Sequence, residues 1–175
     1  KPFACGDRHD PLAIQQACGG ILSVEEINPV FLKVPASPYA AALLENRSVD
    51  VEAGRQGFYS LAARHSIVIV EGAGGWEVPL AGHVTMADFA AELNLPVIVV
   101  VNNRLGCLNH TLLTVKNIQQ RGLTCAGVIL NYAHDERDAA SISNRMVLQN
   151  FLKVPVLAEV MHGETEIDWP ADLDS

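Results

Sequence analysis

The fold is decided by an unbroken run of five β-branched residues, Val97-Ile98-Val99-Val100-Val101. Three similar apolar runs flank it, and the starts of the four runs are separated by 30, 29 and 30 residues, at 67–70, 97–101, 126–130 and 156–160. A strand, a crossover helix and the return need about 30 residues, so this spacing is typical of βαβ units. Because the runs are nearly continuous rather than alternating, they predict parallel strands that are buried on both faces.

Helices are predicted between and before these runs, because suitable capping residues precede them. Thr85 opens a T-x-x-D pattern, Ser37 is followed by a proline, and Asn109 and Asp50 can each cap a helix. The predicted helices cover 85–93, 110–120, 39–46, 51–65 and 139–152. The sequence therefore predicts an α/β fold in three layers, with a parallel β-sheet flanked by helices. We expect one domain over 1–163, followed by an acidic tail over 164–175.

Composition and charge exclude several classes of protein. The chain has 175 residues, of which 49% are hydrophobic and 18% are charged, so it is rich enough in apolar residues to fold. The longest aliphatic run has five residues, whereas a membrane-spanning helix needs about 20, so we expect no membrane partner. The formal net charge of −8 argues against nucleic acid as a partner. Four dispersed cysteines and the absence of zinc-like spacing predict reduced thiols and no structural metal.

The carboxyl ends of parallel strands are where ligands bind in open α/β sheets, and the loops there are polar and rich in glycine. The first run is followed by Glu71 and then Gly72-Ala73-Gly74. A carboxylate beside exposed backbone N–H groups suits a magnesium-bound nucleotide, but the same residues could simply form a tight turn. The phosphate-binding pattern G-x-x-x-x-G-K-[ST] is absent, because none of the four lysines follows a glycine.

Two further candidate sites have equally simple structural readings. The segment 104–109 precedes a predicted helix, whose first N–H groups could receive a carboxylate or phosphate, although Asn109 could serve only as the cap. Lys1 could be an ordinary exposed lysine, and Asp10 could cap a helix that starts at Pro11. Residue types and spacing alone leave both pairs of alternatives open.

Five motifs taken together resemble the dethiobiotin synthetase family. They are K-P-F-A-C-G at 1–6, V-E-G-A-G-G-W-E-V-P-L at 70–80, L-P-V-I-V-V-V at 95–101, R-L-G-C-L-N-H-T-L-L-T at 104–114 and G-L-T-C-A-G-V-I-L-N at 122–131. The resemblance runs from Lys1 to about Gly163. It implies a cytoplasmic, homodimeric enzyme of biotin biosynthesis with a P-loop NTPase-like fold, which uses ATP and Mg²⁺. The implied reaction joins CO₂ to 7,8-diaminononanoate as a carbamate, phosphorylates the carbamate and closes a ureido ring.

The same resemblance implies a role for each matching residue. Lys1 would be catalytic, and Asp10 and Glu71 would hold Mg²⁺. ATP would be bound by Asp10, Glu71, Gly72, Ala73, Gly74, Asn131, Tyr132, Met161, His162 and Gly163. The substrate would be bound by Cys5 and by Gly106, Cys107, Leu108 and Asn109, the last four contributed by the partner subunit across the dimer interface.

Two departures from the family pattern affect these expectations. Cys5 stands where many members have a hydroxyl residue, and a thiol is a weaker hydrogen-bond donor. The family's phosphate loop precedes the K-P segment, whereas Lys1 is the first residue of this sequence. We therefore expect that the sequence is a fragment, and that it is inactive unless the first strand, the phosphate loop and its helix are added back.

Two other functions stay open at this point. One is a related P-loop synthetase of the kind that amidates cobyrinate, against which the L-G-C-x-N-H segment argues. The other is a dimerising or binding module without catalytic activity.

Overall fold

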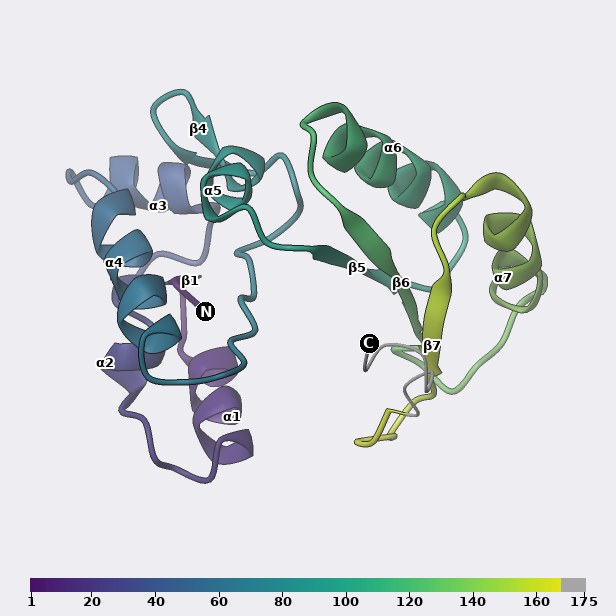
Figure 1. The fold of residues 1–175 in the computed structure, drawn as a ribbon, viewed down its shortest axis with the longest axis horizontal. Coiled ribbons are helices and arrows are strands. Elements are labelled where there is room, and N and C mark those ends of the chain that lie inside the picture. Colours follow the sequence, from purple (N-terminus) through teal and green to yellow (C-terminus); the bar gives the residue numbers. More distant parts are fainter. Residues whose placement is uncertain (168–175) are drawn as a thin grey trace. The chain divides into compact units, whose positions relative to one another are not determined.

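The computed structural model describes residues 1–167 and divides the chain into two compact units, Lys1–Leu93 and Asn94–Ser175 (Figure 1). Each unit contains parallel strands together with helices, so the predicted α/β class with helix-flanked parallel sheets is confirmed. The expected acidic tail, 164–175, falls partly on residues 168–175, which lie outside the described part of the chain. No helix within residues 1–167 is long and apolar enough to cross a bilayer.

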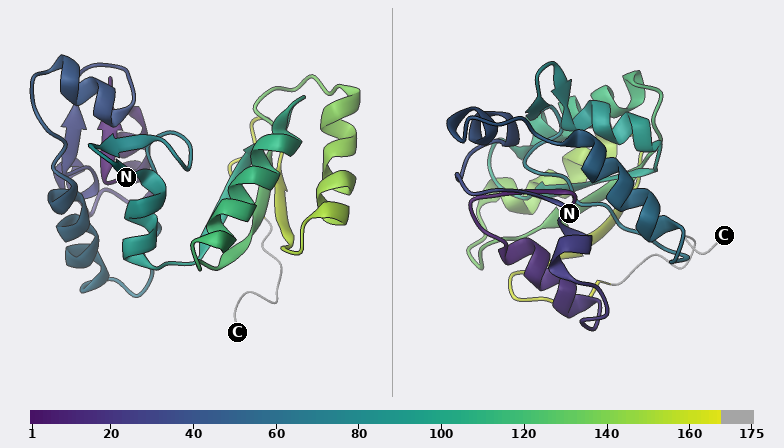
Figure 2. Two further views of the ribbon diagram at one scale, coloured as in Figure 1. Left: turned by 90° about the horizontal axis from the view of Figure 1, so that it is seen from above. Right: turned by 90° about the vertical axis from the view of Figure 1, so that its left-hand side faces the viewer.

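The second unit is a three-stranded parallel sheet with two crossover helices. Its elements, in chain order, are β5 (Val97–Asn102), α6 (Cys107–Gln120), β6 (Cys125–Asn131), α7 (Ala139–Phe151) and β7 (Val156–Val160). The strand order is β5-β6-β7, and all pairings are parallel. Helix α6 packs on β5 and β6, α7 packs on β7, and the two helices contact each other (Figure 2). Three of the four predicted strands and two of the predicted helices are therefore confirmed.

The strand register brings the predicted binding segments of this unit to one edge. Asn102 at the end of β5 pairs with Asn131 at the end of β6, which in turn pairs with Val160 at the end of β7. The loops that begin after these three residues therefore leave the sheet at its carboxyl edge.

Burial within the sheet differs from the prediction of two covered faces. In β6, Val128 and Leu130 are fully buried, because this strand has neighbours on both sides. In β5, Ile98 is 42% exposed and Val100 is 63% exposed. The prediction is therefore wrong for β5, which is an edge strand of this three-stranded sheet.

The first unit contains two short sheets among five helices. Its elements, in chain order, are β1 (Phe3–Cys5), α1 (His9–Ala17), α2 (Val24–Ile27), β2 (Val30–Leu32), α3 (Pro38–Leu44), α4 (Val51–Ala62), β3 (Pro79–Ala81), β4 (Val84–Thr85) and α5 (Met86–Leu93). Strands β1 and β2 pair in parallel, whereas β3 and β4 form an antiparallel pair. Neither short sheet was predicted.

The core of the first unit is built around Phe3 on β1. The rings of Phe3 and Phe89 are 5.0 Å apart and nearly perpendicular, which is a favourable edge-to-face arrangement. Helix α4 approaches this ring closely at Gly54, where an added Cβ would lie 2.5 Å from Phe3 Cζ. Because Gly54 has no side chain, helix α4 can pack directly on β1. Strand β1 contains Cys5, one of the predicted site residues.

The segment 67–70 is not a strand, contrary to the prediction. It has no ladder partner among the described residues, and Ile67 and Ile69 are 80% and 87% exposed. An extended segment becomes a strand only when a neighbour completes its backbone hydrogen bonds, and β-branched composition does not supply that neighbour.

Some of the predicted helix starts are confirmed and two are wrong. Thr85 Oγ1 accepts from the Asp88 N–H, so the predicted T-x-x-D opening of α5 forms. Asn109 is not a cap, because α6 begins two residues earlier and its N-cap is Gly106, with φ of +92°. Asp10 is not a cap either, because α1 begins at His9 and places Asp10 in its first turn.

Candidate active site

Lys1 lies between two carboxylates that are remote from it in the sequence. Its Nζ is 2.8 Å from Asp10 Oδ2 and 2.6 Å from Glu71 Oε1. The lysine side chain is only 8% exposed, whereas those of Asp10 and Glu71 are 61% and 52% exposed. The structure thus brings together the three charged residues to which the family resemblance gave a role, with the cation buried and the anions facing solvent.

Three different elements position this triad. Lys1 lies two residues before the first residue of β1, Asp10 lies in the first turn of α1, and Glu71 opens the loop that leads to β3. Gly74 in that loop has a φ of +75°, a conformation that glycine adopts without strain. An added Cβ there would also approach Val78 Cγ2 to 3.1 Å. The loop after Glu71 therefore depends on glycine at this position.

The triad shifts the protonation equilibria of its members. Burial by itself lowers the pKa of Lys1, but the hydrogen bonds and the charges of Asp10 and Glu71 outweigh it and raise the pKa above 10.5. The hydrogen bond from Lys1, together with its charge, lowers the pKa of Asp10 below 3.8. At neutral pH the lysine is therefore a cation and Asp10 an anion.

A pocket of about 370 Å³ opens beside the triad and is lined by Lys1, Asp10, Cys5, Ala73 and Gly74. All five belong to the predicted site. Burial raises the pKa of the Cys5 thiol above 9.0, so the thiol is neutral at physiological pH and can act only as a weak donor.

Asp10 and Glu71 are a suitable donor set for Mg²⁺. This ion binds through one or two carboxylates together with substrate phosphates and water, rather than through a cage made only of protein ligands. The described residues include no group of three or more His, Cys, Asp or Glu side chains able to hold a metal. Lys1 contacts one oxygen of each carboxylate, and each carboxylate has a second oxygen.

A buried polar network fixes the start of α6 in the second unit. Asn103 and Asn144 are 6% and 3% exposed, and Asn144 Nδ2 donates to Asn103 Oδ1 at 2.8 Å and to Cys107 Sγ at 3.2 Å. Asn103 Nδ2 in turn donates to Ser141 O on α7 at 2.9 Å. The network ties the loop before α6 to the neighbouring helix and so holds the predicted carboxylate-binding segment 106–109.

The predicted anion-binding groups at this helix start are only partly free. The Cys107 N–H already donates to Arg104 O at 3.1 Å. The following N–H groups, on Leu108 and Asn109, belong to the first turn and have no acceptor within the helix. Cys107 is buried, and burial raises the pKa of its thiol, so its side chain is part of the network rather than a charged ligand.

The predicted nucleotide-binding residues of the second unit lie at or just after the ends of β6 and β7. Tyr132 follows Asn131 directly, is 7% exposed and donates its hydroxyl to Glu159 Oε1 at 2.9 Å. The Arg137 guanidinium lies 5.0 Å from the centre of the Tyr132 ring and donates to Met161 Sδ. A pocket of about 290 Å³ is lined by Tyr132 and Arg137 but does not reach Asn131, Met161, His162 or Gly163. The structure therefore brings Tyr132, Arg137 and Met161 together, without one cavity that joins all the predicted residues.

Comparison with known proteins identifies the family. The family model described as "AAA domain" matches residues 1–167. The ATP-dependent dethiobiotin synthetase of Akkermansia muciniphila is 44% identical over 168 residues, which cover 96% of this chain and 79% of that protein. The chain belongs to the dethiobiotin synthetase family.

Other dethiobiotin synthetases match over similar spans. The protein of Aromatoleum aromaticum is 44% identical over 170 residues, covering 93% of this chain and 75% of that protein. The protein of Bacillus subtilis is 36% identical over 162 residues, which cover 90% of this chain and 70% of that protein. The resemblance stated from five motifs is thus confirmed over nearly the whole chain.

Several residues of the candidate sites in the two units were not predicted. The first pocket is also lined by Ala4, Asp7, Ala36, Ser37, Pro38 and Val78. Ser37 was interpreted only as a helix cap, yet its side chain makes no capping hydrogen bond to α3. Asn103 and Asn144 were missed because a buried amide pair leaves no spacing pattern in the sequence. Asn103 could have been noticed, since it directly follows a strand end.

Proposed function

We propose that the protein is an ATP-dependent dethiobiotin synthetase, which joins CO₂ to 7,8-diaminononanoate and closes the ureido ring. The observation that carries this proposal is the Lys1 ammonium held between Asp10 and Glu71, beside a pocket in the first unit. Membership of the dethiobiotin synthetase family supports the same reaction.

The reaction has three steps. An amine of the substrate adds to CO₂ and loses a proton, which gives a carbamate. A carbamate oxygen then attacks the γ-phosphorus of ATP, and ADP leaves, which gives a carbamic-phosphoric anhydride. Finally the neighbouring amine attacks the carbonyl carbon and loses a proton, while phosphate departs with the former carbamate oxygen. The ring of dethiobiotin is then closed.

The carbamate and the γ-phosphate are both anions, so they repel each other as the phosphoryl group is transferred. The charge of Lys1 offsets this repulsion. An ammonium group has three N–H donors, and Asp10 and Glu71 occupy two of them. The third donor serves the carbamate and the transferring phosphoryl group, where a fixed cation stabilises the developing negative charge. The two carboxylates keep the lysine protonated and in place.

Asp10 and Glu71 would also hold the nucleotide's Mg²⁺, since each carboxylate has an oxygen that Lys1 does not contact. When bound, the ion neutralises charge on the phosphates. Glu71, Gly72, Ala73 and Gly74 flank the phosphates, where the backbone N–H groups of a glycine-rich loop can approach an anion closely. Mg²⁺ and ATP are thus the cofactor and the co-substrate of the proposed enzyme.

The nucleobase lies near the carboxyl edge of the second unit. Asn131 carries an amide that can pair with a donor and an acceptor on the base edge. Tyr132 lies beside it, and Met161, His162 and Gly163 follow the adjacent strand β7. The contact between Met161 and Arg137 supports a grouping of these segments.

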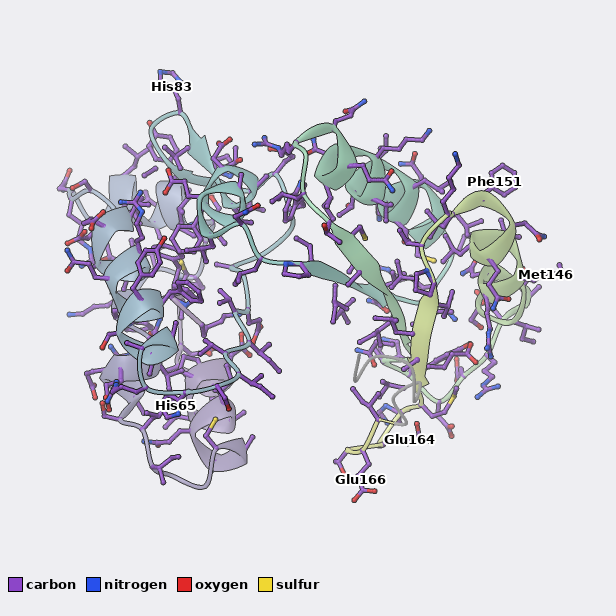
Figure 3. The ribbon with its side chains drawn as sticks, viewed as in Figure 1. His65, His83, Met146, Phe151, Glu164 and Glu166 are labelled. Carbon is purple, nitrogen blue, oxygen red and sulfur yellow. The ribbon has the colours of Figure 1, made fainter. Side chains whose placement is uncertain are left out.

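The substrate carboxylate binds at the start of α6, between Gly106 and Asn109, and the segment comes from the second copy of a homodimer. Exposed apolar side chains on α7 support a second copy: Ile142, Met146 and Phe151 are 67%, 62% and 71% exposed. Figure 3 shows Met146 and Phe151 pointing away from the sheet.

Cys5 contacts substrate in the first-unit pocket. The four free cysteines fit a reducing cytoplasm.

The test is a product assay on the complete gene product. Incubation with 7,8-diaminononanoate, bicarbonate, Mg²⁺ and ATP is expected to give dethiobiotin by mass spectrometry, with one ADP formed per dethiobiotin. Omission of diaminononanoate should abolish ADP formation. A complete gene product that makes no dethiobiotin, under conditions where a known dethiobiotin synthetase does, contradicts the proposal.

A further inference from the structure

Asn28 is a fully buried amide that contacts the backbone of Lys1. It is 0% exposed, and its Nδ2 donates to Lys1 O at 3.0 Å and to Val30 O at 3.0 Å. These two acceptors, and Pro2 O at a longer 3.5 Å, are carbonyl oxygens, so the NH₂ end of the amide must face them, which fixes its orientation. A single side chain therefore joins Lys1, two residues before β1, to Val30, the first residue of β2.

The sequence around Lys1 explains why a side chain is needed there. The ladder between the strands reaches Pro2, whose carbonyl accepts from the Val30 N–H at 3.1 Å. Pro2 has no N–H group of its own and can donate nothing to fix the chain at this point. Asn28 supplies a donor one residue further out, at the Lys1 carbonyl.

The Asn28 side chain is kept at this position although one of its groups is unsatisfied. Its Oδ1 is buried and has no hydrogen-bond partner among residues 1–167. An unpaired buried acceptor is destabilising, so an apolar residue at this position would make the core more stable. The asparagine is therefore explained by the hydrogen bonds that its Nδ2 donates. Its own N–H closes α2 by donating to Val24 O, which holds its backbone rigidly.

We propose that Asn28 is a positioning residue that fixes the backbone of Lys1, so that the ammonium reaches Asp10 and Glu71. This rests on the proposed function, in which Lys1 is the catalytic cation. Asn28 touches neither the reacting atoms nor the carboxylates and acts only through Lys1. Its loss lets the backbone at Lys1 move, and small displacements of a catalytic group are costly.

The experiment compares Asn28→Ala and Asn28→Leu with Ile27→Val in the complete gene product. Ile27 is the adjacent buried residue, 4% exposed, and its shortening disturbs the same core without removing a hydrogen bond. Asn28→Leu keeps the volume filled and removes the unpaired acceptor. Both Asn28 variants are expected to lower kcat for dethiobiotin formation about 10-fold or more, with KM for ATP changed less than about twofold. Ile27→Val should leave kcat unchanged.

A double-mutant cycle separates positioning from general destabilisation. In a Lys1→Ala background, Asn28→Ala should change the residual kcat by less than about twofold, because the residue through which it acts is gone. Equal fold losses in both backgrounds would overturn the proposal, as would a full kcat in folded Asn28→Leu.

A readout that needs no catalysis distinguishes this proposal from the proposed function. The Lys1 side chain is 8% exposed and should be acetylated slowly by acetic anhydride, relative to the exposed Lys33. In Asn28→Ala the ratio of Lys1 to Lys33 acetylation, measured by peptide mass spectrometry, should rise several-fold. An unchanged ratio overturns the positioning role even if the enzyme makes dethiobiotin, and a raised ratio supports it even if the enzyme makes none.

Discussion

At the scale of single residues, the Lys1 side chain shows how a buried ammonium group is kept protonated. Burial opposes the charge, and Asp10 and Glu71 restore it at 2.8 and 2.6 Å. The ion pairs contribute little to the stability of the fold, because Asp10 and Glu71 are more than half exposed. Their effect is to hold a donor at the pocket.

Replacing Lys1 should therefore affect the reaction far more than the fold. Lys1→Ala is expected to lower kcat about 100- to 1000-fold, the usual loss when one donor to a developing anion is removed. Lys33→Ala, at an exposed lysine of the same unit, is the matched control and should keep full activity. Steady-state kinetics on the complete gene product measure both. Equal kcat in the two variants contradicts the catalytic role.

Little of the candidate site could be predicted from residue types alone. A lysine near the start of a chain and an aspartate before a proline both have ordinary structural readings, and only the motif resemblance singled out Lys1 and Asp10. Asn28 gives no signal in the sequence, because its importance comes from two carbonyls that only the folded chain brings near it. Spacing patterns detect periodic contacts along an element, not single contacts between remote segments.

At the scale of elements, helix starts were predictable where side-chain capping decides them. Thr85 Oγ1 accepts a hydrogen bond from the Asp88 N–H, as the T-x-x-D pattern indicates. Asn109 has a capping residue's chemistry, yet the backbone turns earlier, at Gly106. A glycine with positive φ can begin a helix without a side-chain bond, and this possibility is invisible to a search for capping residues.

The two positions give a direct comparison. Thr85→Ala should cost about 1 kcal/mol of the free energy of unfolding, the usual cost of a lost cap. Asn109→Ala, at an exposed position inside α6, should change it by less than about 0.5 kcal/mol. Urea denaturation followed by circular dichroism measures both. A larger loss for Asn109→Ala than for Thr85→Ala would show that α6 is capped as the sequence first indicated.

Helix α2 carries a pH-dependent contribution to stability. The Ser23 backbone N–H, together with Arg64 and the Ser23 hydroxyl, lowers the pKa of Glu26 from 4.5 to about 2. Because the pKa is lower in the folded state, this contribution is complete above about pH 4.5 and is lost as the pH falls toward 2. Thermal melts should therefore show a larger Tm difference between wild type and Glu26→Gln at about pH 6 than at about pH 3. A difference that grows on acidification contradicts the assignment.

Strands were predictable where they have five residues or more, and not where they are shorter. The runs at 97–101, 126–130 and 156–160 form the predicted parallel sheet. Strands β1 and β2 have three residues each and too little sequence to show a pattern. The run at 67–70 has the composition of a strand, but composition cannot supply the hydrogen-bonding neighbour on which a strand depends.

At the scale of the whole molecule, both chains of the proposed homodimer contribute residues to each substrate site. Exposed Met146 on α7 is suited to an apolar contact between copies (Figure 3). Light scattering of the complete gene product should give twice the chain mass, and Met146→Glu should shift it toward the monomer, because a charge is costly inside such a contact. Glu166→Gln, at an exposed residue near the end of the described chain, should leave the mass unchanged. A wild-type protein that is monomeric at micromolar concentration contradicts the dimer.

The central claim is that this chain uses the charge of Lys1, Asp10 and Glu71 to let ATP phosphorylate a carbamate. The most direct measurement follows the oxygen atoms of CO₂ labelled with ¹⁸O. If a carbamate oxygen attacks the γ-phosphorus and later departs with it, one ¹⁸O atom should appear in the released phosphate for each dethiobiotin formed. Phosphate that carries no label, while dethiobiotin accumulates from labelled CO₂, would contradict the account.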